Sequence, residues 1–395
     1  MQTFSVARVP RIVFGAGVRA QLPALARRFG ERVLLVTGAR AFLHSPAGAA
    51  TVQSLAAAGF HIERTSVAQE PSPALVDAAV AQFRAANIDV VIGIGGGSVL
   101  DAAKAIAGLL RVGDSVMDYL EGVGPERPYA GPAVPLIALP TTAGTGSEAT
   151  KNAVLSQHGA NGFKKSFRDD KLVAEYALVD PDLLASCPPA LIAANGMDAL
   201  TQLLESFVSL KANPFTDALC ESGLAAARDG LLPWYLAGPD ESAPARGQMA
   251  YAALLSGITL AQAGLGSVHG LAAPLGAFFP IPHGVACGTL VAVATERNIA
   301  ALEARAPRHP ALGKYARAAE ILTQRRFDDA SAAQAALVAL LHDWATRMAV
   351  PSLSNFGIQF EDLPRIVANA RGNSMKTNPI VLSDAELHTL LEQRL

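Results

Sequence analysis

The stretch VVIGIGGGSVLDAAKAIA, residues 90–107, joins an apolar strand pattern to a helical pattern through a run of glycines. Val90–Ile94 has the composition of a buried strand. The glycines that follow let the backbone approach a ligand closely, and the free N–H groups at a helix start favour anions such as pyrophosphate. A tight turn without a ligand would also need glycines, and the spacing is not the usual Gly-x-Gly-x-x-Gly pattern. Ser98 and Asp101 have the Ser-x-x-Asp spacing of a capping arrangement, which predicts a helix N-terminus in either case.

Further strand patterns lie on both sides of this stretch, at residues 33–36, 135–139 and 177–179, with helical patterns at 47–58 and 73–86. Strands that alternate with helices predict a parallel sheet whose ligands bind at the carboxyl ends of the strands.

A second loop of small residues, PTTAGTGS, follows the strand pattern at 135–139 and spans residues 140–147. Two such loops at one sheet edge favour a nucleotide site. After about residue 182 the chain is rich in Ala and Leu at helical spacing, with no convincing strand pattern. We therefore predict a dinucleotide-binding α/β domain over residues 1–185 and a helical domain over 186–395, with a hinge at 187–189.

A predicted helix at residues 195–207 carries Asp198 and Gln202 on one face. Taken alone, an Asp that hydrogen-bonds in the core and a solvated Gln would explain this pair. Downstream, His269 lies among small and apolar residues, and His283 follows a proline-rich turn. Together the four side chains would supply a carboxylate oxygen, an amide oxygen and two imidazole nitrogens, a set suited to Fe(II), Zn(II) or Co(II).

The composition excludes several classes of partner. The 395 residues are 51% hydrophobic and 17% charged, with a formal net charge of −2 and no long basic run, so we expect no nucleic-acid or membrane partner. The apolar segment 249–268 is interrupted by polar residues and predicts a buried helix. Cys187, Cys220 and Cys287 form no Cys-x-x-Cys pair, so neither a disulfide framework nor a thiolate metal site is expected, and the cytoplasm fits.

Five motifs in order resemble the iron-containing, or group III, alcohol dehydrogenase family. They are GGGSVLD at 95–101, PTTAGTGSE at 140–148, MDALT at 197–201, HGLAAPLG at 269–276 and PHG at 282–284. The resemblance implies a Rossmann-like N-terminal α/β domain and an all-α C-terminal domain. It also implies a homodimer that binds NAD or NADP and a divalent metal, with Fe(II) as the first expectation and Zn(II) as the alternative.

The same resemblance assigns site residues. It implies metal ligation by Asp198, Gln202, His269 and His283, of which Asp198, His269 and His283 are also the expected catalytic residues. The residues that we expect at the cofactor are Gly38, Gly95, Gly96, Gly97, Ser98, Asp101, Thr141, Thr142, Thr145 and Lys164.

Three positions depart from the family pattern. Gln202 stands where the first of three histidine ligands is expected, and its amide oxygen is a weaker ligand than imidazole. Ala273 replaces a further histidine that many members have near the nicotinamide. Gly38 stands where NAD-preferring members often carry an Asp that repels a 2′-phosphate, and Arg40 is close in sequence, so NADP stays open.

The expected function is reversible hydride transfer between a small alcohol or aldehyde and nicotinamide, with a metal as the Lewis acid. A metal-independent keto-acid reductase, similar to maleylacetate reductases, is an alternative that the replacements at 202 and 273 suggest. A lyase similar to dehydroquinate synthase is a more distant one, because the metal segments carry no concentration of basic residues. A nucleotide-binding sensor that has lost turnover is the alternative from outside enzymes.

Overall fold

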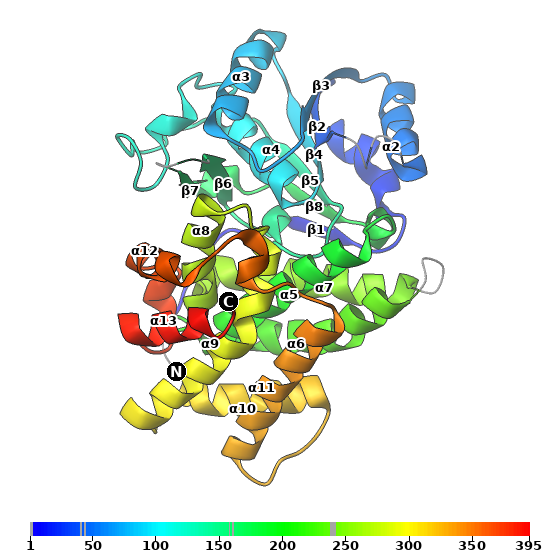
Figure 1. Cartoon of the computed structure of the whole chain (residues 1–395). Coiled ribbons are helices and arrows are strands. Elements are labelled where there is room, and N and C mark those ends of the chain that lie inside the picture. Colours follow the sequence, from blue (N-terminus) through cyan, green and yellow to red (C-terminus); the bar gives the residue numbers. More distant parts are fainter. Residues whose placement is uncertain (1–2, 40–41, 43–44, 158, 160–161, 238–241) are drawn as a thin grey trace. The chain divides into compact units, whose positions relative to one another are not determined.

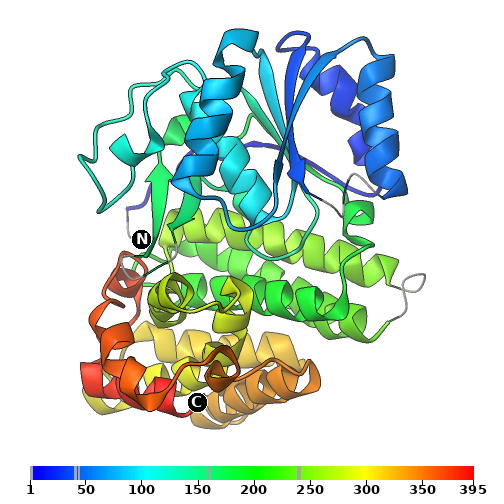
Figure 2. The same cartoon turned by 45° about the horizontal axis from the view of Figure 1, so that its top comes forward.

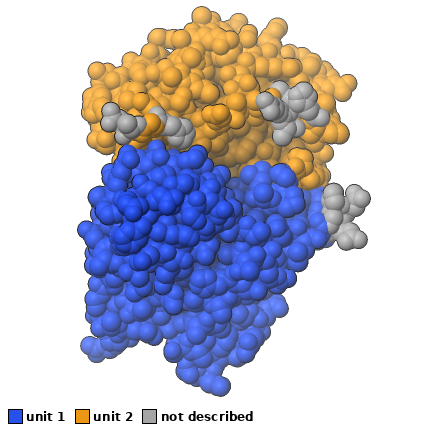
Figure 3. All heavy atoms as spheres, in the orientation of Figure 1, with its two compact units in different colours: residues 1–6, 188–395 blue, residues 7–187 orange. Residues whose placement is uncertain are grey.

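A computed structural model describes residues 3–39, 42, 45–157, 159, 162–237 and 242–395 of the chain. These residues form two compact units, shown in different colours in Figure 3. One unit comprises residues 7–187. The other comprises residues 188–395 together with the short segment before Ala7.

The first unit is built on a six-stranded parallel sheet with the order β1-β8-β5-β4-β2-β3. Helices lie on both faces of the sheet, with α3 and α4 on one side and α1 and α2 on the other (Figure 2). This arrangement confirms the predicted Rossmann-like fold class. The strands are β1 (Arg11–Phe14), β2 (Arg32–Gly38), β3 (His61–Val67), β4 (Val90–Gly95), β5 (Leu136–Pro140) and β8 (Tyr176–Val179), and the helices are α1 (Leu22–Ala26), α2 (Pro46–Ala57), α3 (Pro73–Phe83) and α4 (Gly97–Leu109).

Strand β3 and a separate antiparallel hairpin, β6 (Asn152–Gln157) with β7 (Phe163–Arg168), were not predicted from the sequence. β3 is the edge strand of the sheet, and Val67 is its one buried residue. An edge strand that is largely exposed needs no apolar run, so the apolar pattern that reveals β2 and β4 is missing there.

The adjacent strands β4 and β5 bring the two small-residue loops to one edge of the sheet. Gly95 and Pro140 are paired in register at the ends of these strands, and the Thr141 N–H donates a hydrogen bond to the Gly95 carbonyl at 3.0 Å. Because both strands run in the same direction, both loops leave the sheet at its carboxyl edge. The two loops are therefore adjacent at this edge, as the sequence predicts.

The second unit is helical, and its described residues contain no strand. Figure 1 shows α5 at its centre, and α5 packs against α6, α7 and α9. Sixteen of the twenty residues of α5 are buried, including Asp198, which makes it a core helix. The helices are α5 (Pro189–Val208), α6 (Pro214–Leu236), α7 (Ala243–Ala263), α8 (Ser267–Phe278), α9 (His283–Arg305), α10 (Pro310–Thr323), α11 (Ala330–Arg347), α12 (Leu363–Ala368) and α13 (Asp384–Glu392).

The apolar segment 249–268, predicted as one buried helix, is two helices. α7 ends at Ala263, and α8 begins at Ser267 after a bend of 100°. Gly264 at the bend has φ +74, and a Cβ there would lie 2.7 Å from Thr377 Oγ1. Only glycine fits both the backbone conformation and the packing, so the chain turns at this point. The turn makes His269 the third residue of α8.

Helix α9 is long enough and apolar enough to cross a membrane. However, 78% of its 18-residue apolar stretch is buried inside the protein. A core helix of a globular unit has the same apolar character, because its neighbours are protein side chains on every side.

A buried polar cluster fixes the loop after β5 against α4. Lys104 Nζ donates hydrogen bonds to the Ser147 carbonyl at 3.0 Å and to Thr150 Oγ1 at 2.9 Å, and it lies 3.1 Å from Asp101 Oδ1. Glu148 is buried in the same loop, and desolvation raises the pKa of its carboxyl to about 7, against the smaller effect of Lys104. The folded protein therefore holds this carboxyl largely neutral below pH 7.

Substituting Glu148→Gln tests this burial. The raised pKa means that the folded chain keeps a proton which the unfolded chain releases above its ordinary pKa of 4.5. Relative to the variant, whose amide at position 148 does not titrate, the parent should lose about 3 kcal/mol of unfolding free energy as pH rises from about 4.5 to about 7. Chemical denaturation of both proteins across this range measures the difference. Parallel pH curves for parent and variant would contradict the expectation.

Candidate active site

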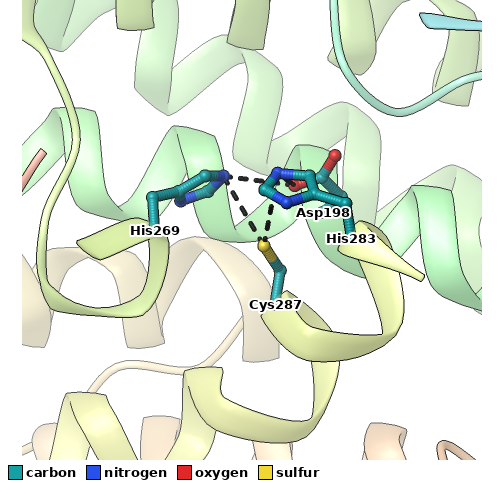
Figure 4. Close-up of side chains that lie close together, drawn as sticks. All are labelled: Asp198, His269, His283 and Cys287. Carbon is teal, nitrogen blue, oxygen red and sulfur yellow. Dashed lines mark hydrogen bonds and ion pairs between the residues drawn. The ribbon is translucent and has the colours of Figure 1, made fainter. Parts of the chain in front are cut away.

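Four side chains from three helices converge in the helical unit (Figure 4). They are Asp198 on α5, His269 on α8, and His283 and Cys287 on α9. One potential ligand atom from each lies within 4.8 Å of the corresponding atoms of the others. Asp198, His269 and Cys287 are buried, and His283 is partly exposed. The three predicted ligands Asp198, His269 and His283 therefore lie together.

Each helix presents its side chain for a local reason. Asp198 lies midway along α5, where the helix is surrounded by α6, α7 and α9. His269 lies in the first turn of α8, just after the bend at Gly264. His283 is the first residue of α9 after Pro282, and Cys287 follows one turn later, so both project from the same face.

The distances within the cluster are short. His269 Nε2 lies 3.2 Å and His283 Nε2 3.8 Å from Asp198 Oδ1. Cys287 Sγ lies 3.6 Å from His269 Nε2 and 3.8 Å from His283 Nε2. The second carboxylate oxygen, Asp198 Oδ2, is buried and has no hydrogen-bond partner among the described residues. A buried carboxylate oxygen without a donor is costly unless a cation or a proton neutralises it.

Glu205 completes the arrangement from the next turns of α5. Its Oε2 lies 2.6 Å from His269 Nδ1, and its Oε1 accepts a hydrogen bond from the Val268 N–H at 2.7 Å. A carboxylate at Nδ1 keeps the proton on that nitrogen and leaves the lone pair of Nε2 directed at the cluster. This carboxylate–histidine pair is the usual support of a metal-bound imidazole.

Electrostatics couple the four groups. Burial by itself would raise the pKa of Asp198, but the charge of His283 and the hydrogen bond with His269 hold it below its usual value. The pKa of His269 lies well above its ordinary value, because Cys287, Asp198 and Glu205 outweigh the effect of burial. Burial raises the pKa of the Cys287 thiol to about 12. A divalent cation would reverse this preference, since a coordinating thiol is deprotonated outright.

Gln202, the fourth predicted ligand, is buried one turn after Asp198 on α5. Its Oε1 accepts a hydrogen bond from Ser256 Oγ of α7 at 2.7 Å. An amide oxygen has two lone pairs, so this bond leaves one available, and ligation by Gln202 stays a prediction.

Cys287 and Glu205 were not predicted as site residues. Cys287 belongs to no Cys-x-x-Cys pair, but it follows His283 as His-x-x-x-Cys on one helix. Glu205 lies seven residues after Asp198, two helical turns along the same face, and this spacing was visible in the sequence. Neither spacing indicates a metal site by itself, because each becomes informative only when a metal is already expected nearby.

The glycine loop leads into helix α4, whose N-terminus has no side-chain cap. Gly95 ends β4, Gly96 is the N-cap of α4 and Gly97 is its first residue, without a side-chain cap. The predicted capping role of Ser98 and Asp101 is therefore wrong, because the helix begins before Ser98. Asp101 instead accepts a hydrogen bond from Ser147 Oγ at 2.6 Å. The uncapped N–H groups are the donors that an anion would use.

The two loops pack against each other through glycine and threonine. A Cβ on Gly96 would lie 3.2 Å from Thr142 Oγ1, and one on Gly97 would lie 2.7 Å from Thr145 Cγ2. Contact with Thr145 therefore disfavours any side chain at position 97. Thr141 contributes through its N–H bond to Gly95. The structure thus brings together the predicted cofactor residues of these loops.

The remaining predicted positions lie elsewhere or have other contacts. Gly38 is the last residue of β2, at the carboxyl edge of the same sheet. Lys164, on β7, forms an ion pair of 2.5 Å with Glu70, so its ammonium already has an anionic partner. Ala273 is partly buried on α8, and Arg40 lies outside the described residues.

Comparisons with known proteins cover nearly the whole chain. Residues 10–181 match the iron-containing alcohol dehydrogenase family, and residues 192–395 match the C-terminal part of the Fe-containing alcohol dehydrogenase family. The NAD-dependent methanol dehydrogenase of Bacillus methanolicus is 31% identical over 393 residues, 98% of each chain. The 1-propanol dehydrogenase of Citrobacter freundii is 35% identical over 339 residues, 84% of each chain.

Solved structures agree with the sequence relatives. A 1,3-propanediol oxidoreductase superimposes with a TM-score of 0.89 at 28% identity, covering 100% of both chains. A sulfoacetaldehyde reductase from Bifidobacterium kashiwanohense, solved with NAD⁺, has a TM-score of 0.83 at 27% identity and covers 100% of this chain and 99% of its own. Both halves of the sequence and the complete fold thus agree, and the chain belongs to the iron-containing alcohol dehydrogenase family as an NAD-linked alcohol dehydrogenase.

Proposed function

We propose that this alcohol dehydrogenase catalyses metal-dependent, reversible hydride transfer between a small primary alcohol, or its aldehyde, and nicotinamide. Asp198, His269 and His283 hold the metal in this proposal. The observation that carries it is the convergence of their ligand atoms around Asp198, whose buried Oδ2 has no hydrogen-bond donor in the part of the chain that the structure describes.

The residues fit a divalent cation by the chemistry of their donors. Imidazole and carboxylate together suit Fe(II) and Zn(II), and we propose one of these as the metal. When bound, the metal supplies a Lewis acid that polarises the carbonyl oxygen or favours the alkoxide at neutral pH. The nicotinamide supplies or accepts the hydride.

The side chains of the unit hold the donors in place. Glu205 keeps the His269 imidazole in one tautomer and one orientation through a 2.6 Å contact. Burial of Asp198 and His269 limits the access of water to their oxygen and nitrogen atoms. Ligands fixed on helices rather than on loops keep their mutual distances when substrate binds.

The cofactor is proposed to bind through the loops of the α/β unit. The N–H groups at the start of α4 would hold the pyrophosphate, and Gly96 and Gly97 let it approach the backbone. Thr141, Thr142 and Thr145 line the neighbouring loop. Gly38 carries no charge that would repel a 2′-phosphate, so we propose that NADP is accepted as well as NAD.

Relatives support the substrate class. Methanol, 1-propanol and 1,3-propanediol, which stand in the names of similar proteins, are small primary alcohols. We also propose that the enzyme is a homodimer, as the sequence resemblance implies, and that it is cytoplasmic, as the cysteine pattern indicates. No disulfide joins the three cysteines, all of which lie in the described part of the chain, and this suits a reducing compartment.

Substituting His269→Ala should remove both metal retention and turnover, because the variant loses one ligand and leaves Glu205 without its imidazole partner. Elemental analysis after reconstitution with Fe(II) or Zn(II) and desalting measures the first, and NADH oxidation with small aldehydes measures the second. His61→Ala, an exposed histidine on β3, is the matched control. Full activity of the His269 variant would exclude the metal mechanism, and chelator-resistant reduction of a keto acid would favour the metal-free reductase.

Substituting Gly97→Ala should weaken NADH binding about tenfold or more, because the new Cβ would meet Thr145 and occupy the approach of an anion to the helix start. Fluorescence titration with NADH and NADPH measures both affinities. Gly247→Ala on α7 adds a Cβ with nothing within 4 Å and serves as the control. Unchanged affinities in the Gly97 variant would remove this loop from the proposed cofactor site.

A further inference from the structure

We infer that Cys287 is the fourth protein ligand of the metal, so that the ligand set is Asp198, His269, His283 and Cys287. This inference rests on the proposed function, since it assumes that the cluster holds a divalent metal. The fourth ligand position, which the family resemblance gives to Gln202 on α5, is thereby assigned to the thiolate of Cys287 on α9.

The spacing of the donor atoms carries the inference. In a tetrahedral zinc site, bond lengths of about 2.3 Å to sulfur and about 2.0–2.1 Å to nitrogen or oxygen place sulfur about 3.5 Å from each nitrogen. Cys287 Sγ lies 3.6 Å from His269 Nε2 and 3.8 Å from His283 Nε2.

The oxygen donor fits the same tetrahedron. The same bond lengths place oxygen and nitrogen ligands about 3.4 Å apart. Asp198 Oδ1 lies 3.2 Å from His269 Nε2 and 3.8 Å from His283 Nε2. Four of the six separations among the donor atoms are therefore within a few tenths of an ångström of those in a tetrahedral ligand set, and the other two lie within 4.8 Å.

The position of Cys287 on its helix makes it a rigid donor. It is completely buried, and it lies one turn after His283 on α9. Two ligands four residues apart on a helix are held by the same backbone hydrogen bonds, so their separation does not depend on loop conformation. The buried Asp198 Oδ2, for which the described residues offer no hydrogen-bond partner, is a second sign that this location holds a cation.

Gln202 is the competing candidate, and its environment is less suited to the role. Its Oε1 already accepts a hydrogen bond from Ser256 Oγ. An amide oxygen is also a neutral, hard donor, whereas a thiolate carries a full charge and is soft. One thiolate with two imidazoles and a carboxylate favours tetrahedral Zn(II) or Co(II) over Fe(II).

The test is the absorption spectrum of the protein reconstituted with Co(II). A thiolate ligand produces a sulfur-to-cobalt charge-transfer band in the near ultraviolet, which oxygen and nitrogen ligands do not. The double variant Cys187→Ala/Cys220→Ala leaves Cys287 as the only one of the three cysteines. It should show the same band as the parent, and this readout requires no change in the cluster itself.

Matched single variants then separate the two candidate ligands. Cys287→Ala and Cys287→Ser should lose the band and bind Zn(II) with an affinity lower by more than ~100-fold, since even residues that only support a ligand contribute about 10–100-fold. Gln202→Leu removes the amide oxygen at similar volume and should keep both the band and the stoichiometry.

The outcomes distinguish this inference from the proposed function. Co(II) bound at one ion per chain without the band, in the parent and in the double variant, would overturn ligation by Cys287 and leave the metal enzyme intact. Loss of metal from Gln202→Leu with retention in Cys287→Ala would likewise assign the position to the amide. Failure of the parent to bind any of these metals would remove both proposals.

Discussion

The burial of a carboxylate in the middle of a core helix is the constraint on which the site depends. Asp198 is 1% exposed, and among the described residues only one of its two oxygens meets donors. An ionised carboxylate in such a place is costly unless positive charge compensates it. The histidines of α8 and α9 provide part of that compensation, and a divalent cation among the same atoms would provide the rest.

The helices of the second unit bring side chains from distant parts of the sequence to this carboxylate. α5 lies among α6, α7 and α9, so side chains along its length face several partners at once. The break at Gly264 starts a new helix whose first turn carries His269, and the start of α9 after Pro282 carries His283. Glu205 ties α5 to α8 through His269 and the Val268 N–H. The same helix therefore supplies one of the proposed ligands, Asp198, and the carboxylate that contacts another, His269.

A different constraint applies to the α/β unit, where the backbone of the glycine loop lies very close to neighbouring residues. Gly95, Gly96 and Gly97 each lie where a Cβ would meet a neighbouring side chain, and two of those neighbours belong to the threonine loop. The buried Lys104 joins that loop to α4 through carbonyl and hydroxyl oxygens. Packing by itself disfavours a side chain at Gly95 and Gly97, and the uncapped helix start adds the anion-binding capacity.

The sequence by itself determined the parallel sheet, the helical second half and the two loops, because these depend on local periodicity and on strand ends that a parallel sheet must bring to one edge. Asp198, His269 and His283 were also accessible to it, through their setting and the family motifs. Only the tertiary structure decided that Cys287 and Glu205 join them, that α7 and α8 are separated by a bend at Gly264, and that α4 begins before Ser98. Local patterns report which face of a helix is apolar, but they do not report which residues of distant helices meet. That meeting depends on packing angles and helix ends, which residues far apart in the chain set together.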